Sequence, residues 1–169
     1  MKTLKEKLTQ LNFNISIMKS ILIIVVLFAL LPFGLIAQEN IEKETIKKVI
    51  QSAYVDGLQN NGPVADIEKG FHPGFNLLGL RNDDLTKWPI YSWIKYHEKE
   101  LKENPGPPKE DEIVTCKYPH IDITGTAAIA KIELYKGGQK IYTDYLSLYK
   151  FDEGWKIVSK IYFKHEAKE

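Results

Sequence analysis

The fold is decided by residues 112–165 of the chain, which read EIVTCKYPHIDITGTAAIAKIELYKGGQKIYTDYLSLYKFDEGWKIVSKIYFKH. Short turns interrupt this stretch at Gly125, at Gly137-Gly138 and at residues 152–154. Between the turns, apolar and polar residues alternate as they do in half-buried strands. The sequence therefore predicts four antiparallel strands joined by hairpins, over residues 112–123, 126–135, 140–151 and 155–165.

Alternation along these strands assigns their side chains to the two faces of the sheet. In the last strand, one face carries Trp155, Ile157, Ile161 and Phe163, and the other carries Lys156, Lys160 and Lys164. We expect the first set in the core and the lysines in solvent. In the third strand, Asp144 shares the inner face with Leu146 and Leu148. A carboxylate is therefore expected among apolar side chains.

The segment before these strands reads as mainly helical. Apolar residues at helical spacing predict helices over residues 40–58, 63–70 and 89–103, with a short strand over residues 75–80. In the first long strand of the sheet, Pro119 marks a bulge next to His120. We expect an α+β, cone-shaped fold, in which about three N-terminal helices pack on a strongly curved, mainly antiparallel sheet of four long strands and one or two short ones.

The N-terminus has the layout of a secretory signal peptide. Lys19 precedes an unbroken apolar run over residues 21–31, and small and apolar residues continue to Ala37 before the polar Gln38. The apolar segment is shorter than the roughly 20 residues that span a bilayer, which favours cleavage over a retained membrane anchor.

We therefore expect a signal peptide over residues 1–37, with Met18 as an alternative start, and a single domain over residues 38–169. The mature protein would be exported, either periplasmic or secreted. Only the signal segment, before its cleavage, would meet the membrane.

Composition and spacing exclude several classes of function. The net charge is +1, and no block of Lys and Arg is interleaved with aromatic residues, so nucleic acid is not an expected partner. Cys116 is the only cysteine, which rules out an internal disulfide. No Cys and His spacing is typical of a metal site and no Gly-rich phosphate loop occurs, so neither a metal nor a cofactor is expected.

Three segments resemble a known family. They are residues 54–58 with 71–73, residues 121–123 with 127–132, and residues 143–148 with 154–160. In this order they resemble the "putative lumazine-binding" family of the nuclear transport factor two-like (SnoaL-like, cystatin-like) superfamily. The resemblance implies a cavity for a small ligand, in a superfamily that includes isomerases, dehydratases and cyclases. Many relatives carry an acid where this chain has Gly74, so a role for that acid does not carry over.

Asp144 and His72 are the candidate catalytic residues. A carboxylate among apolar side chains can act as a general base or orient a ligand, and a histidine can exchange protons near neutral pH. The simpler alternatives are a carboxylate that caps a strand end and a histidine bonded within its own turn. The ligand pocket is expected to be lined by Tyr54, Phe71, His72, Tyr91, Trp93, Tyr118, Asp144 and Trp155. Core packing is the more common use of such rings.

The sequence leaves three functions open. The first is an exported protein that binds a small apolar or aromatic molecule without catalysis. The second is a small isomerase, dehydratase or cyclase that uses Asp144 with His72 or a tyrosine. The third is a homodimeric interaction module whose exposed sheet face carries Tyr145 and Tyr149. The first is preferred because no acid–base pair is evident, and a buried Asp144 bonded to His72 or Tyr54 would favour the second.

Overall fold

The computed structural model describes residues 18–19 and 38–166. The chain divides into two units, Met1–Ile41 and Glu42–Glu169. In the first unit, the described residues 18, 19 and 38–41 are helical. Most of the expected signal segment lies outside the described residues, so its cleavage and the export of the protein stay predictions. Within the described ranges, no helix has the length and apolar character needed to cross a membrane.

The helices of the second unit follow the expected order. Residues 42–49 are α-helical and continue as the π-helix η1 (Ile50–Gln59), α2 spans Val64–Gly70, and α3 spans Ile90–Glu103. The second half of the first helix is thus wound more widely than an α-helix. In η1, the consecutive residues Ala53, Tyr54 and Val55 are all buried. This segment therefore packs against neighbours around much of its circumference.

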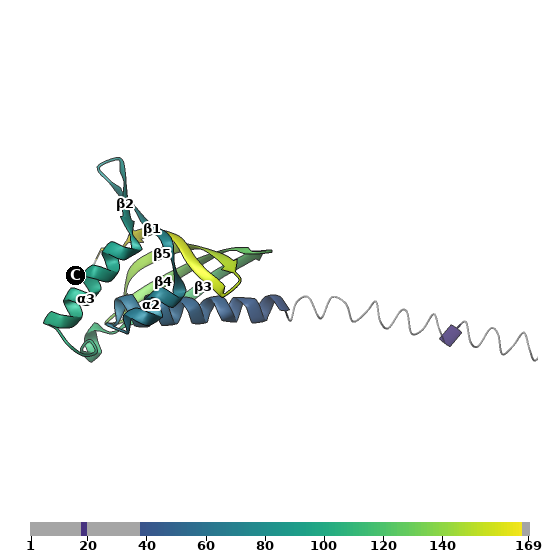
Figure 1. Cartoon of the computed structure of the whole chain (residues 1–169), viewed down its shortest axis with the longest axis horizontal. Coiled ribbons are helices and arrows are strands. Elements are labelled where there is room, and N and C mark those ends of the chain that lie inside the picture. The colour runs from purple at the N-terminus through teal and green to yellow at the C-terminus, as the bar shows by residue number, and fades with distance from the viewer. Residues whose placement is uncertain (1–17, 20–37, 167–169) are drawn as a thin grey trace, which may run out of the picture. The chain divides into compact units, whose positions relative to one another are not determined.

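Six strands form one mixed sheet in the order β2-β1-β6-β5-β4-β3. They are β1 (Phe71–Arg81), β2 (Asp84–Pro89), β3 (Val114–Thr124), β4 (Ala127–Lys136), β5 (Gln139–Phe151) and β6 (Gly154–Lys164). β1 runs parallel to β6, and all other neighbours are antiparallel. Figure 1 shows a strongly curved sheet with α2 and the helix that ends at residue 59 along one side. This is the α+β architecture expected from the sequence.

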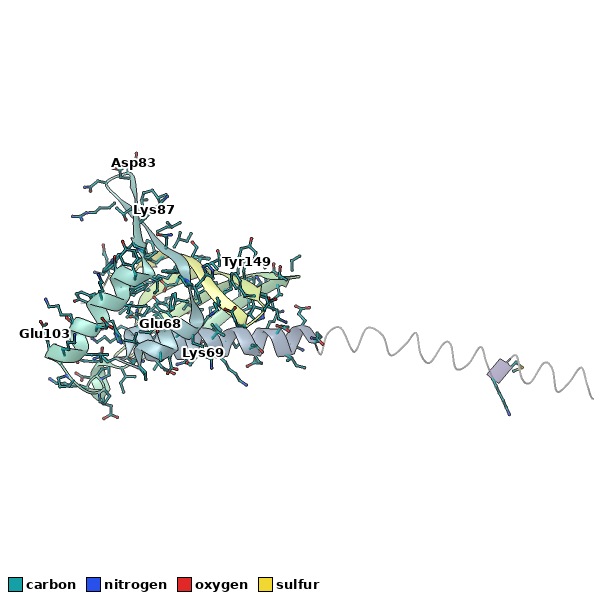
Figure 2. All side chains as sticks on the ribbon, in the orientation of Figure 1. Glu68, Lys69, Asp83, Lys87, Glu103 and Tyr149 are labelled. Carbon is teal, nitrogen blue, oxygen red and sulfur yellow. The ribbon has the colours of Figure 1, made fainter. Side chains whose placement is uncertain are left out.

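The β1–β2 hairpin differs from the prediction of one short strand over residues 75–80. Its two-residue turn is formed by Asn82 and Asp83, which have φ angles of 51° and 64°. Positive φ at both positions is the requirement of a type I′ turn. All residues of β2 except the last are exposed, so no buried alternation marks this strand in the sequence. Figure 2 shows Asp83 at the tip of the hairpin.

The hydrophobic core lies between the helices and the inner face of the sheet. The helices contribute Ile46, Ile50 and Ile67, all with no exposed surface, and the strands contribute residues such as Ile132. Trp155, at the start of β6, is 3% exposed. Its assignment to the inner face is therefore confirmed.

A β-bulge in β6 shifts the register of its pairing with β5. Leu148 of β5 pairs with Ile157 of β6. The next pair is Ser147 with Ser159, so Val158 is an extra residue in β6. A bulge of one residue moves every later side chain of the strand to the opposite face.

The side chains beyond this bulge therefore face the opposite way from our prediction. Lys160 is buried, with 5% of its surface exposed, whereas Ile161 and Phe163 are 52% and 63% exposed. The assignment of Lys160 to solvent, and of Ile161 and Phe163 to the core, is wrong. Simple alternation holds only up to Val158.

Candidate functional site

The bulge in β6 places a lysine ammonium group inside the fold. In the sheet, Lys160 lies between Leu77 of β1 and Leu146 of β5. Asp144 is two residues from Leu146 along β5 and so points to the same face. Tyr54 approaches from η1, whose buried side chains pack in the core. Three elements thus bring together the side chains that we call the Tyr54–Asp144–Lys160 triad.

Short polar contacts join the triad. The Tyr54 hydroxyl donates to Asp144 Oδ2 at 2.6 Å, and Lys160 Nζ donates to the same oxygen at 2.8 Å. Lys160 Nζ also donates to the Tyr54 hydroxyl oxygen at 2.5 Å. Tyr54, Asp144 and Lys160 have exposed fractions of 1%, 0% and 5%. The triad is therefore a buried ion pair bridged by a hydroxyl group.

The second carboxylate oxygen of Asp144 has no such partner. Asp144 Oδ1 is buried and makes no hydrogen bond within the part of the chain that the structure describes. Buried polar atoms are nearly always paired, because an unpaired acceptor loses the hydrogen bonds it would make to water. Asp144 Oδ1 is therefore a buried acceptor without a partner among the described residues.

Aromatic rings surround the ammonium group of Lys160. The ring centroids of Tyr54, Trp93, Tyr142 and Tyr162 lie 4.7, 5.5, 5.9 and 5.1 Å from Nζ. We call these four residues the aromatic cage. A ring face within about 6 Å attracts a cation, which offsets part of the cost of removing it from water. Trp93 is also stacked on Trp88 of β2, with centroids 6.1 Å apart, so the β1–β2 hairpin helps to position the cage.

Burial shifts the protonation equilibria of the triad. Desolvation lowers the pKa of Lys160, while the charge and hydrogen bond of Asp144 oppose that shift. Desolvation raises the pKa of the Tyr54 hydroxyl well above its ordinary value, and the charge of Asp144 raises it further. Tyr54 is therefore a proton donor throughout the physiological pH range. Lys160 releases its proton more readily than a surface lysine does.

A hollow at the surface reaches one wall of the aromatic cage. It has a volume of about 710 Å³ and lies at the ends of β5 and β6, where Tyr142, Lys164 and His165 help to line it. Tyr142 belongs both to this hollow and to the cage. The hollow therefore adjoins the aromatic cage at Tyr142.

Some of the predicted pocket residues meet at the triad. Tyr54 and Asp144 are bonded to each other, and Trp93 contacts the Tyr54 ring edge-on with centroids 5.8 Å apart. Phe71 makes a similar contact with Tyr54 at 6.2 Å. These residues form one continuous aromatic wall beside the ion pair.

His72 does not contact the triad through any hydrogen bond or ring contact described, and it bonds within its own turn instead. Its Nδ1 accepts the Gly74 N–H at 3.0 Å, and its ring stacks on Phe151 with centroids 4.8 Å apart. This is the turn histidine of the simpler interpretation. Of the two partners considered for Asp144, the structure supplies the tyrosine, Tyr54.

The remaining predicted residues lie in other surroundings. The Tyr118 hydroxyl donates to Gln51 Oε1 at 2.9 Å, and the Trp155 indole N–H donates to Glu42 at 2.6 Å. Tyr91 is 62% exposed on α3, so the structure does not place it in a pocket wall. Among residues 18–19 and 38–166, no cluster of three His, Cys, Asp or Glu side chains could hold a metal ion.

Sequence reasoning missed three members of this site. Tyr142 is two residues from Asp144 along β5, so alternation alone could have added it to the pocket. Lys160 and Tyr162 lie beyond the β6 bulge, where alternation gives the wrong face. No glycine or proline stands at the bulge to reveal it.

Comparisons with known proteins agree with this fold. The family model described as "Putative lumazine-binding" matches residues 41–163. An aldolase, FrzH from Cladobotryum sp, is 27% identical over 130 residues, which are 75% of this chain and 97% of the aldolase.

Two similar solved structures are NTF2-like proteins of unknown function. The one from Shewanella baltica OS155 is 29% identical, with 75% of this chain and 95% of that chain covered and a TM-score of 0.57. The one from Methylobacillus flagellatus KT is 26% identical, with 73% and 91% covered and a TM-score of 0.55. The nuclear transport factor two-like fold expected from the sequence is confirmed.

Proposed function

Because this chain belongs to the family described as "Putative lumazine-binding", we propose that it takes up a small organic molecule and moves a proton next to that molecule's carbonyl group at the Tyr54–Asp144–Lys160 triad. One observation carries the proposal. The Asp144 carboxylate is fully buried, with Oδ2 held by two donors and Oδ1 left unpaired by the described residues. Such an oxygen is placed to accept a proton from a ligand.

In the proposed reaction, Asp144 Oδ1 is the general base. It removes the hydrogen from the carbon next to the carbonyl, and the C–H electron pair forms the C=C bond of an enolate. The enolate oxygen then carries negative charge. An ammonium group has three N–H donors, and Lys160 directs two of them at Tyr54 and Asp144. The third is available to stabilise the enolate oxygen in a water-poor site.

The aldolase relative supports this class of reaction. An aldol reaction starts by forming a carbon nucleophile next to a carbonyl group, which is the step assigned here to Asp144. The hydrogen bond between Tyr54 and Asp144 also favours an enzyme over a passive binding protein, because it fixes the base in one orientation. The sequence alone gave preference to binding without catalysis.

Binding without catalysis is the second candidate, at the same triad. The aromatic cage favours a small apolar or aromatic molecule, and Asp144 Oδ1 would accept a hydrogen bond from it. The description of the family as lumazine-binding supports a ring-shaped ligand. The two candidates differ in what a change of Asp144 does to turnover and to affinity.

The test is hydrogen–deuterium exchange into cyclohexanone and acetone, which serve as probe ketones in D2O and are followed by proton NMR. The wild-type protein should accelerate exchange next to the carbonyl, and Asp144→Asn should lower this acceleration by about 10²–10⁴-fold, the usual contribution of a general base. The matched control is Asp122→Asn, which changes an exposed aspartate of β3.

The control should exchange the probe ketones at the wild-type rate. Equal rates in wild type and Asp144→Asn would refute catalysis by Asp144. If the wild type binds the probe ketones but does not accelerate deuterium exchange, the second candidate function, binding without catalysis, is supported.

We also propose that the protein is exported. The apolar segment before Gln38, preceded by Lys19, supports this proposal. The protein recovered from outside the cytoplasm should have an intact mass that starts at or near Gln38. A full-length mass in a washed membrane fraction would instead indicate a retained anchor.

The outer face of the sheet supports a homodimer as a further proposal. Tyr145 and Ile161 are paired across β5 and β6, and they are 46% and 52% exposed. Tyr149 on the same face is 52% exposed, and Figure 2 shows it on the sheet, apart from Glu68 and Lys69 of α2.

A further inference from the structure

The surroundings of Lys160 suit it for a reaction as well as for an ion pair. Its Nζ lies inside the fold, within hydrogen-bond distance of one carboxylate and one hydroxyl, and the rest of its surroundings are aromatic. The other lysines of β6 differ, because Lys156 pairs with Glu153 at the surface and Lys164 is exposed. Only Lys160, among the lysines of this strand, combines burial with an adjacent acid–base group.

We propose that Lys160 Nζ forms an imine with the carbonyl carbon of a small ketone or aldehyde held in the aromatic cage. This inference rests on the proposed function and specifies it further. The substrate class then becomes carbonyl compounds small enough to pass Tyr142, and Lys160 becomes a catalytic residue that bonds to them. A lysine that is removed from water in an apolar pocket is the type that forms such bonds.

The covalent step balances with the groups in the triad. The Lys160 ammonium first gives a proton to Asp144, and the free amine attacks the carbonyl carbon to form a C–N bond. The carbonyl oxygen takes the proton from Asp144, and the nitrogen then returns one proton to Asp144. That proton leaves with the hydroxyl group as water while the C=N bond forms. The net reaction converts an ammonium group and a carbonyl compound into an iminium ion and water.

The Tyr54 hydroxyl is placed to relay these protons. It contacts both Lys160 Nζ and Asp144 Oδ2, at 2.5 and 2.6 Å. Its raised pKa keeps it protonated between transfers. Once the iminium ion has formed, Asp144 Oδ1 can remove the neighbouring C–H proton more easily than from the free ketone. The product is an enamine, the carbon nucleophile of an aldol reaction, and water later releases Lys160.

The lowered pKa of Lys160 is consistent with imine formation at this position. Only the neutral amine attacks a carbonyl carbon, and desolvation increases its share at a given pH. The ring faces of the cage also favour the iminium cation, which replaces the ammonium ion at the same position.

The experiment traps the imine in the wild-type protein. The protein is incubated briefly with acetone and cyanoborohydride near neutral pH, so that hydride adds to the iminium carbon and leaves an isopropyl group on the lysine. Peptide mapping by mass spectrometry then gives the initial labelling rate of each lysine. Lys160 should be labelled faster than Lys164, because burial lowers the pKa of Lys160 and so increases its share of free amine.

Three variants and one unfolded control make the result specific. Lys160→Arg should lose the fast label, and Lys164→Arg should keep it. Asp144→Asn removes the charge that opposes the lowered pKa of Lys160, but it also removes the group that carries protons between nitrogen and oxygen. If that proton transfer limits imine formation, as proposed, this variant should slow the labelling of Lys160 and leave that of Lys164 unchanged. In urea, where the fold is lost, the two lysines should react at similar rates.

Labelling of native Lys160 at or below the rate of Lys164 would overturn the imine. If exchange into the probe ketones nevertheless persisted and depended on Asp144, the proposed proton transfer would stand without a covalent step. If Lys160 is labelled fast but deuterium exchange into the probe ketones does not depend on Asp144, the imine is supported. Asp144 is then not the general base. Because the main comparison uses only the wild-type protein, it does not depend on the folding of a variant.

Discussion

At the scale of single residues, the site depends on two opposite charges that are both buried. A lone charge in a protein core costs several kcal/mol, and a partner with good geometry offsets that cost. Lys160 and Asp144 meet this condition, with Nζ and Oδ2 2.8 Å apart. Tyr54 then adds a hydrogen bond to the shared oxygen. The stability of the pair should therefore depend on the presence of both charges.

Removal of one charge should destabilise the fold more than removal of both. Lys160→Met leaves Asp144 unpaired and should lower the free energy of unfolding by about 3–5 kcal/mol. The double variant Asp144→Leu/Lys160→Met should recover much of this loss. Urea denaturation of these two variants and of the single variant Asp144→Leu, with Lys164→Met as the exposed control, measures the difference. If the double variant is at least as unstable as the sum of its single changes, the ion pair does not couple the two residues.

Tyr54 should make the fold less stable at alkaline pH. Its pKa in the folded protein is raised well above the ordinary value of 10.0, first by burial and then by Asp144. Above that ordinary value, the unfolded chain loses the Tyr54 proton while the folded chain keeps it, so rising pH favours unfolding. The stability that wild type has over Tyr54→Phe should therefore be constant below pH 10.0 and decrease above it. Urea denaturation at several pH values tests this, and a constant difference would contradict it.

At the scale of elements, the bulges of the sheet limited what the sequence could predict. The order of helices and long strands follows from periodicity and turn residues, and Asp144 follows from alternation in β5. In β3, Pro119 marks the register shift between Lys117 and His120, so that bulge was predictable. In β6, Val158 is a β-branched residue between Ile157 and Ser159 and carries no local signal. Its bulge depends on the pairing of β6 with β5 on one side and with β1, which is distant in sequence, on the other.

The consequence for the site is large because one residue decides which face Lys160 occupies. Tyr54 and Trp93 were expected in the pocket from their aromatic character. Their convergence on a lysine could not be predicted, since that requires the register of β6. The β2 strand was missed for a related reason, because its side chains are almost all exposed.

The packing of α2 on η1 gives a prediction at the scale of elements. A Cβ atom at Gly70 would overlap the Cβ of Ala53 and approach Val49. Gly70→Ala should therefore destabilise the fold by about 1–3 kcal/mol, the cost of overpacking. The double variant Ala53→Gly/Gly70→Ala moves the methyl group to the other helix and should restore part of the loss. Thermal unfolding measures both. A Gly70→Ala variant as stable as wild type would show that the two helices can separate freely.

At the scale of the whole folded unit, residues 42–166 present two contrasting faces of one sheet. The inner face holds the core and the triad. The outer face exposes apolar side chains in the centre of the sheet, namely Ile129, Tyr145, Tyr149, Ile161 and Phe163. Exposed apolar side chains gathered on one sheet face are the basis for the homodimer proposed above. Lys131 and Glu133, of opposite charge, follow Ile129 on the same face of β4.

The occupant of this outer face should be a second copy of the chain. A face that carries both Lys131 and Glu133 can meet itself under two-fold rotation if the axis passes between the two charges, so that each faces its opposite, although Glu133 already pairs with Lys140 within its own chain. The change Ile161→Lys puts a charge next to Tyr145 in the centre of the face, where interfaces exclude charge. Sedimentation equilibrium should give a dimer for wild type and a monomer for Ile161→Lys. The control Tyr91→Lys, at an exposed position of α3, should remain dimeric. A wild-type monomer at all concentrations, or a dimer that Ile161→Lys leaves unchanged, would assign the outer face to another role.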